Sequence, residues 1–140
     1  MRQILSVACY NPPMTLYAFI AVGMGAAIGA WLRWSLGLWL NPVTPELPLG
    51  TLAANLVGGY LIGLALATFS HFEALPPEVR LLVTTGFLGG LTTYSTFSAE
   101  AVTLMARQQA GWAAAHICAH LAGSILMTFA GIGSMRLVLR

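Results

Sequence analysis

The chain has 140 residues, of which 58% are hydrophobic and 7% are charged, with a formal net charge of +2. Its mean hydropathy is +0.80. Because a soluble domain carries about 25% charged residues, this composition excludes an ordinary soluble protein and indicates an integral membrane protein.

Residues 1–13 are expected to form a short N-terminal tail ahead of a transmembrane domain at 14–140. The tail has one arginine and ends at Pro12-Pro13, which fits neither a secretory signal nor a transit peptide. Met14 is an alternative start of translation. Cys9 and Cys118 are too few to indicate a disulfide framework.

Four apolar blocks follow the tail, at residues 16–40, 49–70, 79–105 and 112–135. Each meets or exceeds the roughly 20 residues that a helix needs to span the hydrocarbon core. Prolines mark the turns after the first and second blocks: Pro42, Pro45, Pro48, Pro76 and Pro77. The sequence therefore predicts an all-α membrane protein of four transmembrane helices.

Small residues in the first two blocks favour close helix packing. Gly25 and Gly29 in the first block, and Gly59 and Gly63 in the second, are spaced four residues apart, a pattern that lets helix backbones approach. These glycines either pack helices within one chain or join two chains. Both alternatives predict a compact bundle, and we expect a homo-oligomer.

The third block is predicted to be a helix broken in the middle of the membrane. Gly89-Gly90 weaken a helix, and the seven residues at 92–98 include six with hydroxyl groups. Irregular backbone at membrane depth is tolerated only where protein buries it or where it lines a polar path. A hard cation such as Na⁺ would satisfy the carbonyl groups that such a break exposes.

Polar side chains recur at helical spacing in three of the blocks. One stripe contains Thr51, Asn55, Gly59 and Gly63; another contains His116, His120, Ser124 and Thr128; the third contains Tyr94, Ser95, Phe97, Ser98 and Glu100. Each stripe alone is equally explained by hydrogen bonds between helices. Together they predict a narrow path whose hydroxyl and amide donors and aromatic ring edges suit a small anion.

The arginines give only a weak orientation signal. In a four-span arrangement, Arg2, Arg80, Arg136 and Arg140 fall on one side and Arg33 and Arg107 on the other, a difference of 4 − 2 = 2, and the chain has no lysine. Since basic residues near helix ends normally fix the cytoplasmic side, this balance favours a chain that inserts both ways and pairs antiparallel with itself. The alternative is one orientation fixed by the insertion machinery or by a partner.

Three ordered motifs resemble those of one family. The segments 25–33 (GAAIGAWLR), 50–59 (GTLAANLVGG) and 86–100 (GFLGGLTTYSTFSAE) are similar to the Fluc (CrcB-type) fluoride channels. The resemblance runs from about Met14 to the C-terminus. It implies a dual-topology, antiparallel homodimer with two fluoride pores and a central structural Na⁺, in a bacterial cytoplasmic membrane.

The resemblance also implies roles for individual residues. The backbone carbonyls of Gly89 and Thr92 would bind Na⁺, and the Asn55 amide would contact fluoride. The ring edges of Tyr94 and Phe97 would border the path. The remaining positions match a polar track beside the path and a vestibule at its mouth: Ser95, Ser98 and Thr128 for the track, and Thr51, Glu100 and Arg33 for the vestibule.

This chain departs from the family pattern at three positions. Tyr94 stands where Phe is usual, and His116 and His120 stand where Tyr and Ser are common. Because histidine titrates near neutrality, either imidazole would hold or stall an anion when protonated; the alternative is two neutral imidazoles in a helix contact. The pair alone does not predict a zinc site, because no further ligands lie nearby in the sequence.

The expected function is passive export of fluoride, which relieves its toxicity, without catalysis. The expected partners are fluoride, membrane lipid and a second copy of the chain, with no nucleic acid. The alternative is a small four-helix, proton-coupled exporter of drugs or cations, which would use an intramembrane acid such as Glu100. That class needs a deeply placed acid, and the first block has none.

Overall fold

The computed structural model describes residues 15–44, 47–72 and 74–139. The expected tail at 1–13, with Arg2 and Cys9, lies outside the described residues, as do Met14, Pro45 and Arg140. The domain boundary after the tail therefore stays a prediction.

The first long helix, α2, runs from Leu16 to Leu40. It begins at Thr15, whose hydroxyl oxygen accepts a hydrogen bond from the Ala18 N–H at 3.1 Å, as expected of an N-terminal cap. It ends in a short 3₁₀ turn, η1 (Asn41–Val43), where Pro42 follows. The Asn41 side chain accepts from the Gly50 N–H at 2.8 Å and so connects this turn to the next helix.

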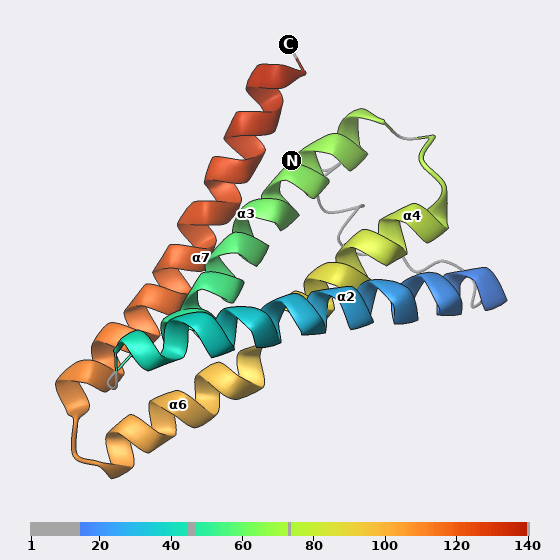
Figure 1. Cartoon of the computed structure of the whole chain (residues 1–140). Coiled ribbons are helices and arrows are strands. Elements are labelled where there is room, and N and C mark those ends of the chain that lie inside the picture. Colours follow the sequence, from blue (N-terminus) through green and yellow to red (C-terminus); the bar gives the residue numbers. More distant parts are fainter. Residues whose placement is uncertain (1–14, 45–46, 73, 140) are drawn as a thin grey trace.

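Two further long helices, α3 (Leu49–His71) and α7 (Ala110–Val138), lie side by side (Figure 1). Gly59 makes this contact close, since a Cβ at that position would lie 2.8 Å from the Ser124 carbonyl oxygen. Gly63 likewise faces the α7 backbone near Gly131. This glycine pair therefore packs helices within one chain, which was one of the two predicted alternatives.

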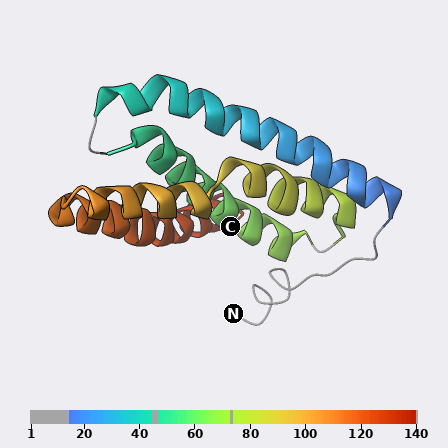
Figure 2. The same cartoon turned by 90° about the horizontal axis from the view of Figure 1, so that it is seen from below.

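α2 packs against residues 82–91, which follow α3 in the chain (Figure 2). Gly25 and Gly29 lie in this contact. A Cβ on Gly25 or Gly29 would collide with backbone atoms of residues 82–91. Both glycine patterns thus serve contacts inside the chain, because only a residue without a side chain lets these backbones approach.

The predicted third span is built from four consecutive helical pieces. They are α4 (Pro77–Leu81), a π-helix η2 (Leu82–Leu88), a single turn α5 (Gly89–Leu91) and α6 (Tyr94–Ala106). Thr92 and Thr93 between α5 and α6 have extended backbones, with ψ angles of 156° and 119°. The Thr93 hydroxyl accepts from the Thr96 N–H at 3.1 Å and starts α6.

The prediction of an all-helical protein is confirmed for the described residues, which contain no strand. Within the part of the chain that the structure describes, three helices are long and apolar enough to cross a membrane: Leu16–Val43, Leu49–His71 and Ala110–Val138. They correspond to the first, second and fourth predicted spans. Large apolar side chains are exposed along these helices, for example Trp39 and Phe129, as expected of a surface that faces lipid or another chain.

Candidate functional site

The Asn55 side chain connects α3 to the interruption between α5 and α6. Its Oδ1 accepts from the Thr93 N–H at 2.8 Å, and its Nδ2 donates to the Thr93 carbonyl at 3.1 Å. The Thr93 N–H is the donor that a continuous helix would direct to the Gly89 carbonyl. The amide therefore takes the place of the helical partner at the break, and the two bonds fix the orientation of its oxygen and nitrogen.

The second amide hydrogen of Asn55 points to α7. Nδ2 lies 3.0 Å from His120 Nδ1, and because Nδ2 can only donate, His120 Nδ1 accepts. The neutral imidazole then carries its hydrogen on Nε2. A chain of hydrogen bonds thus runs from the backbone break through an amide to an imidazole.

On the other side of the break, Arg33 supports α5. Its Nε donates to the Gly90 carbonyl at 3.0 Å, across 57 residues of sequence. The Thr92 hydroxyl donates to the Leu88 carbonyl at 2.9 Å. The Gly90 carbonyl of α5 is therefore held by a long-range bond from Arg33, while the Leu88 carbonyl at the end of η2 accepts from both the N–H and the hydroxyl of Thr92.

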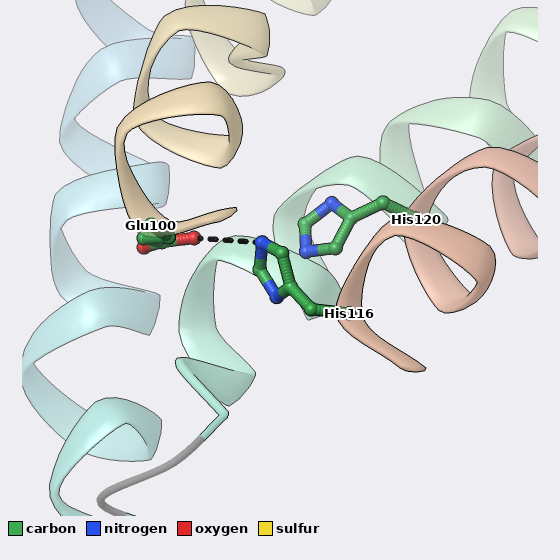
Figure 3. Close-up of side chains that lie close together, drawn as sticks. All are labelled: Glu100, His116 and His120. Atoms are coloured by element: carbon green, nitrogen blue, oxygen red, sulfur yellow. Dashed lines mark ion pairs between the residues drawn. The ribbon is translucent and has the colours of Figure 1, made fainter. Parts of the chain in front are cut away.

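Glu100 belongs to α6, and its side chain lies between Thr51 of α3 and His116 of α7. The Thr51 hydroxyl donates to Glu100 Oε1 at 2.7 Å. Glu100 Oε2 is 3.6 Å from His116 Nε2, and the His116 side chain is only 1% exposed (Figure 3). The carboxylate, whose side chain is 16% exposed, therefore accepts one hydrogen bond through Oε1, and its Oε2 faces the His116 imidazole beyond hydrogen-bond distance.

Aromatic rings connect α6 to α7. The Phe97 ring stacks on the His116 ring, with centroids 5.3 Å apart and planes at 20°. Phe97 also lies 4.9 Å from the His120 ring, and Tyr94 lies 5.5 Å from Phe97. The two imidazoles are 4.4 Å apart. The four rings form a continuous group beside the Asn55 amide.

A groove of about 620 Å³ runs along this group on the surface of the single chain. It gathers six of the predicted fluoride-path residues from three separate segments: Asn55, Tyr94, Phe97, His120, Ser124 and Thr128. Gly89 and Thr92, the predicted sodium ligands, line it as well. Tyr94 is 80% exposed, so this face of the chain is open.

The other predicted residues lie around the groove rather than in its wall. Arg33 and Thr51 line a second hollow of about 360 Å³, which they share with Thr93 and Thr96. Ser95 lies 3.3 Å from the Thr93 hydroxyl. Glu100 and His116 face each other at the α6–α7 contact.

Two of the three hydroxyls in the predicted polar track donate inside their own helix. Ser98 donates to the Tyr94 carbonyl at 2.8 Å, and Thr128 donates to the Ser124 carbonyl at 2.9 Å. Since a hydroxyl has a single hydrogen, neither offers a donor to the groove in this arrangement. Each would have to rotate to bind an anion.

The structure adds Thr93 and Thr96 to the residues that sequence reasoning selected. Thr93 supplies both backbone groups for Asn55 and caps α6, and its hydroxyl donates to Thr96 Oγ1 at 3.0 Å. The signal for both residues was the hydroxyl-rich run itself. The sequence alone did not indicate which of its members hold the break.

Comparison with known proteins identifies the family of this chain. Residues 20–132 match the family model described as CrcB-like protein, Camphor Resistance (CrcB). The chain belongs to this CrcB family, as its motifs had indicated.

Curated relatives match nearly their whole length. A protein of Nitrosospira multiformis named fluoride-specific ion channel FluC is 61% identical over 123 residues, which cover 88% of this chain and 96% of the relative. A protein of the same name from Thiobacillus denitrificans is 60% identical over 121 residues, with 85% and 96% covered. Another from Cupriavidus pinatubonensis is 57% identical over 120 residues, with 86% and 95% covered.

Proposed function

We propose that this chain is a fluoride-selective channel that lets F⁻ leave the cytoplasm passively. The observation that carries the proposal is the groove in which Asn55, Tyr94, Phe97 and His120 meet. Membership in the CrcB family, with relatives named fluoride-specific ion channels, supports the choice of ion. A pore lined by amide and hydroxyl donors and aromatic edges favours a small anion over a cation.

In this proposal the donors along the path exchange their present acceptors for fluoride. Asn55 Nδ2 would replace His120 Nδ1 with the anion while its bonds to Thr93 stay in place. Ser98 and Thr128 would likewise rotate away from their helix carbonyls. Such exchanges suit conduction, which requires binding that is favourable enough to admit an ion and weak enough to release it.

The proposed assembly is an antiparallel homodimer with two pores, in which the break at Thr92-Thr93 lies at mid-membrane in a bacterial cytoplasmic membrane. A second copy on the open groove face would cover Tyr94 and enclose the path. Dual insertion agrees with the near balance of the arginines. Cysteines placed in both loops are then expected to react from both sides of the membrane, whereas labelling from one side only would contradict dual insertion.

We further propose a central Na⁺ held by the backbone carbonyls of Gly89 and Thr92. Oxygen donors of this kind suit a hard cation. The Thr93 N–H, which a continuous helix would direct to the Gly89 carbonyl, donates to Asn55 instead, so this carbonyl is a suitable ligand. The cation would neutralise backbone oxygen atoms that are costly to leave unpaired in a membrane.

Fluoride efflux from liposomes tests the proposed function. Purified protein in vesicles loaded with potassium fluoride is expected to release fluoride to an electrode when valinomycin allows K⁺ to follow, while chloride-loaded vesicles release little chloride. Protein-free vesicles are the control. Equal rates for the two halides, or no release above the control, would contradict a fluoride-selective channel.

Phe97→Ile is expected to reduce fluoride efflux at least about tenfold while leaving the dimer intact. The change removes a ring edge from the groove and the stacking contact with His116, interactions worth about 0.5–1.5 kcal/mol each, whereas the aliphatic side chain keeps the apolar volume. Efflux is measured as above, and assembly by size-exclusion chromatography.

Phe129→Ile is the matched control, because Phe129 is exposed on α7 and is absent from the residues that line the groove. It should leave the flux unchanged. Equal flux in Phe97→Ile and wild type would remove this ring from the proposed path.

The exporter alternative is less well supported by the geometry. Glu100 is not among the described residues that line the groove, and its oxygens face Thr51 and His116. A coupling acid would need access to the substrate path. No specific contact in the described residues favours that function over the channel.

A further inference from the structure

Three side chains of metal-binding type meet where α6 crosses α7. One carboxylate oxygen of Glu100 and one ring nitrogen each of His116 and His120 lie within 4.8 Å of one another. Figure 3 shows Glu100 coming from α6 and facing the two imidazoles, which project from successive turns of α7. The histidine pair offers only two ligands in the sequence, and the fold supplies the third from a distant segment.

Two atoms of this cluster have no hydrogen-bond partner among the described residues. Glu100 Oε2 and His120 Nε2 are buried without a hydrogen bond to any described residue, and the 3.6 Å from Glu100 Oε2 to His116 Nε2 is too long for one. Buried polar atoms in folded proteins are nearly always satisfied. Two unsatisfied atoms that face the same small space therefore indicate a ligand between them.

The chemistry of the donors identifies the class of ligand. Two imidazole nitrogens and one carboxylate oxygen form a set that binds Zn²⁺ with one coordination position left open, whereas Mg²⁺ and Ca²⁺ prefer oxygen ligands alone. We propose that Glu100, His116 and His120 form a binding site for a divalent transition-metal ion such as Zn²⁺. A tetrahedral site brings its ligand atoms to roughly 3.3 Å from one another, so the side chains would move inward by small rotations.

Metal binding at this site has a definite cost. The hydrogen bond from Asn55 Nδ2 to His120 Nδ1 places the imidazole hydrogen on Nε2, the atom that would face the metal. Coordination requires that this hydrogen be on Nδ1 instead, where it would oppose the Asn55 amide. The amide cannot turn to accept it without losing both of its bonds to Thr93.

The free energy lost with these contacts is smaller than the free energy that the zinc–ligand bonds contribute. Coordination gives up one neutral hydrogen bond, from Asn55, and places the Nδ1 hydrogen of His120 against that amide. It also gives up the long 3.4 Å contact between His116 Nε2 and the Phe97 carbonyl. A neutral hydrogen bond contributes far less than a set of zinc–ligand bonds. Metal occupancy is therefore favourable, and it displaces the Asn55 amide from its acceptor.

That displacement predicts inhibition, an extension that depends on the proposed channel function. Asn55, Phe97 and His120 all line the groove, so an ion bound to His120 would disturb the amide and fix the rings. The cation would also hold an arriving anion at its open coordination position. Zinc is thus expected to block fluoride efflux.

Isothermal titration calorimetry of the purified full chain in nanodiscs tests the site directly. Zn²⁺ is expected to bind with one ion per chain, and Mg²⁺ to give no heat of binding. Glu100→Gln and His116→Gln each remove one ligand while retaining a polar side chain, and each should weaken zinc binding by more than about tenfold, since even outer-shell changes cost that much.

Two variants are matched controls for these measurements. His71→Gln removes an exposed histidine at the end of α3, and Cys118→Ser removes an exposed thiol on α7. Both should bind zinc as wild type does. Unchanged affinity in Glu100→Gln and His116→Gln, or an equal loss in His71→Gln or Cys118→Ser, would overturn the proposal.

Crystallography provides a measurement that does not rely on variants. Anomalous diffraction at the zinc absorption edge, from wild-type crystals soaked in zinc chloride, should show a peak between the three side chains. Density for an ordered water only, or a zinc peak elsewhere, would contradict the site.

Efflux assays separate the site from the channel function. Micromolar zinc chloride should slow fluoride efflux from wild-type liposomes, and magnesium chloride should not. Zinc binding in a protein that conducts no fluoride would support the site and reject the proposed function. Full efflux with zinc bound would overturn the predicted block.

Discussion

Asn55→Asp is expected to lower fluoride efflux by about a hundredfold or more. A carboxylate at this position faces an anion in the groove, and two like charges about 4 Å apart repel by about 4 kcal/mol at an effective dielectric constant of about 20. Each increase of about 1.4 kcal/mol in a barrier costs a factor of about ten in rate. The change also removes the Nδ2 donor to the Thr93 carbonyl and to His120. Initial efflux rates from liposomes, normalised to protein content, measure the effect.

Two comparison variants show whether the added charge or the missing amide causes the loss of fluoride efflux. Asn55→Ala removes the amide without adding a charge, so it should conduct better than Asn55→Asp. Gln108→Glu adds the same charge at an exposed residue of the α6–α7 turn, outside the residues that line the groove, and should conduct like wild type. If Asn55→Asp retains normal flux, Asn55 does not contact the permeating ion.

The sequence was sufficient to predict the helical blocks, because long apolar runs bounded by proline leave few alternatives. The observed helices Leu16–Leu40 and Leu49–His71 agree closely with the predicted blocks at 16–40 and 49–70. The π-helix at Leu82–Leu88 could not be predicted. Its residues fit an α-helix equally well, so nothing in the sequence marks the wider hydrogen-bond register of this segment, which packs against α2.

The sequence also did not show whether the spaced glycines pack helices within one chain or between two chains. A spacing of four residues predicts close approach of backbones but does not specify the partner. Only the fold shows that Gly25 and Gly29 face residues 82–91, and that Gly59 and Gly63 face α7. Both contacts are within the chain, so the interface of an oligomer must use other surfaces.

The polar stripes predicted which residues gather but not how they bond. Helical spacing placed Asn55, His120 and Thr128 on faces that do meet in one groove. The same spacing could not show that Asn55 donates to the Thr93 carbonyl, 38 residues away. That bond depends on how α3 lies relative to the extended residues between α5 and α6. Nor could the spacing show that Glu100 completes a cluster with two histidines of another helix.

Gly29→Val is expected to destabilise the fold by about 3 kcal/mol, the upper end of the usual cost of overpacking. Its first added carbon would overlap backbone atoms of Phe87 and Leu91. A side chain can rotate away from a clash, but these backbone atoms belong to η2 and α5, so α2 would have to separate from both. That movement would also withdraw Arg33 from the Gly90 carbonyl and release the end of α5. Thermal unfolding in detergent, followed by size-exclusion chromatography, should show a clear loss of folded protein at lower temperature.

Gly23→Val is the matched control for this prediction, because it adds the same side chain to the same helix. Outside the neighbouring backbone of its own helix, a Cβ on Gly23 would have no heavy atom within 4 Å among the described residues, so the variant should unfold at the temperature of wild type. The comparison separates the contact from the effect of valine on the helix itself, which is common to both variants. Equal stability of the two variants would mean that α2 is not held against η2 and α5 at Gly29, and the support of the break through Arg33 would then need a different origin.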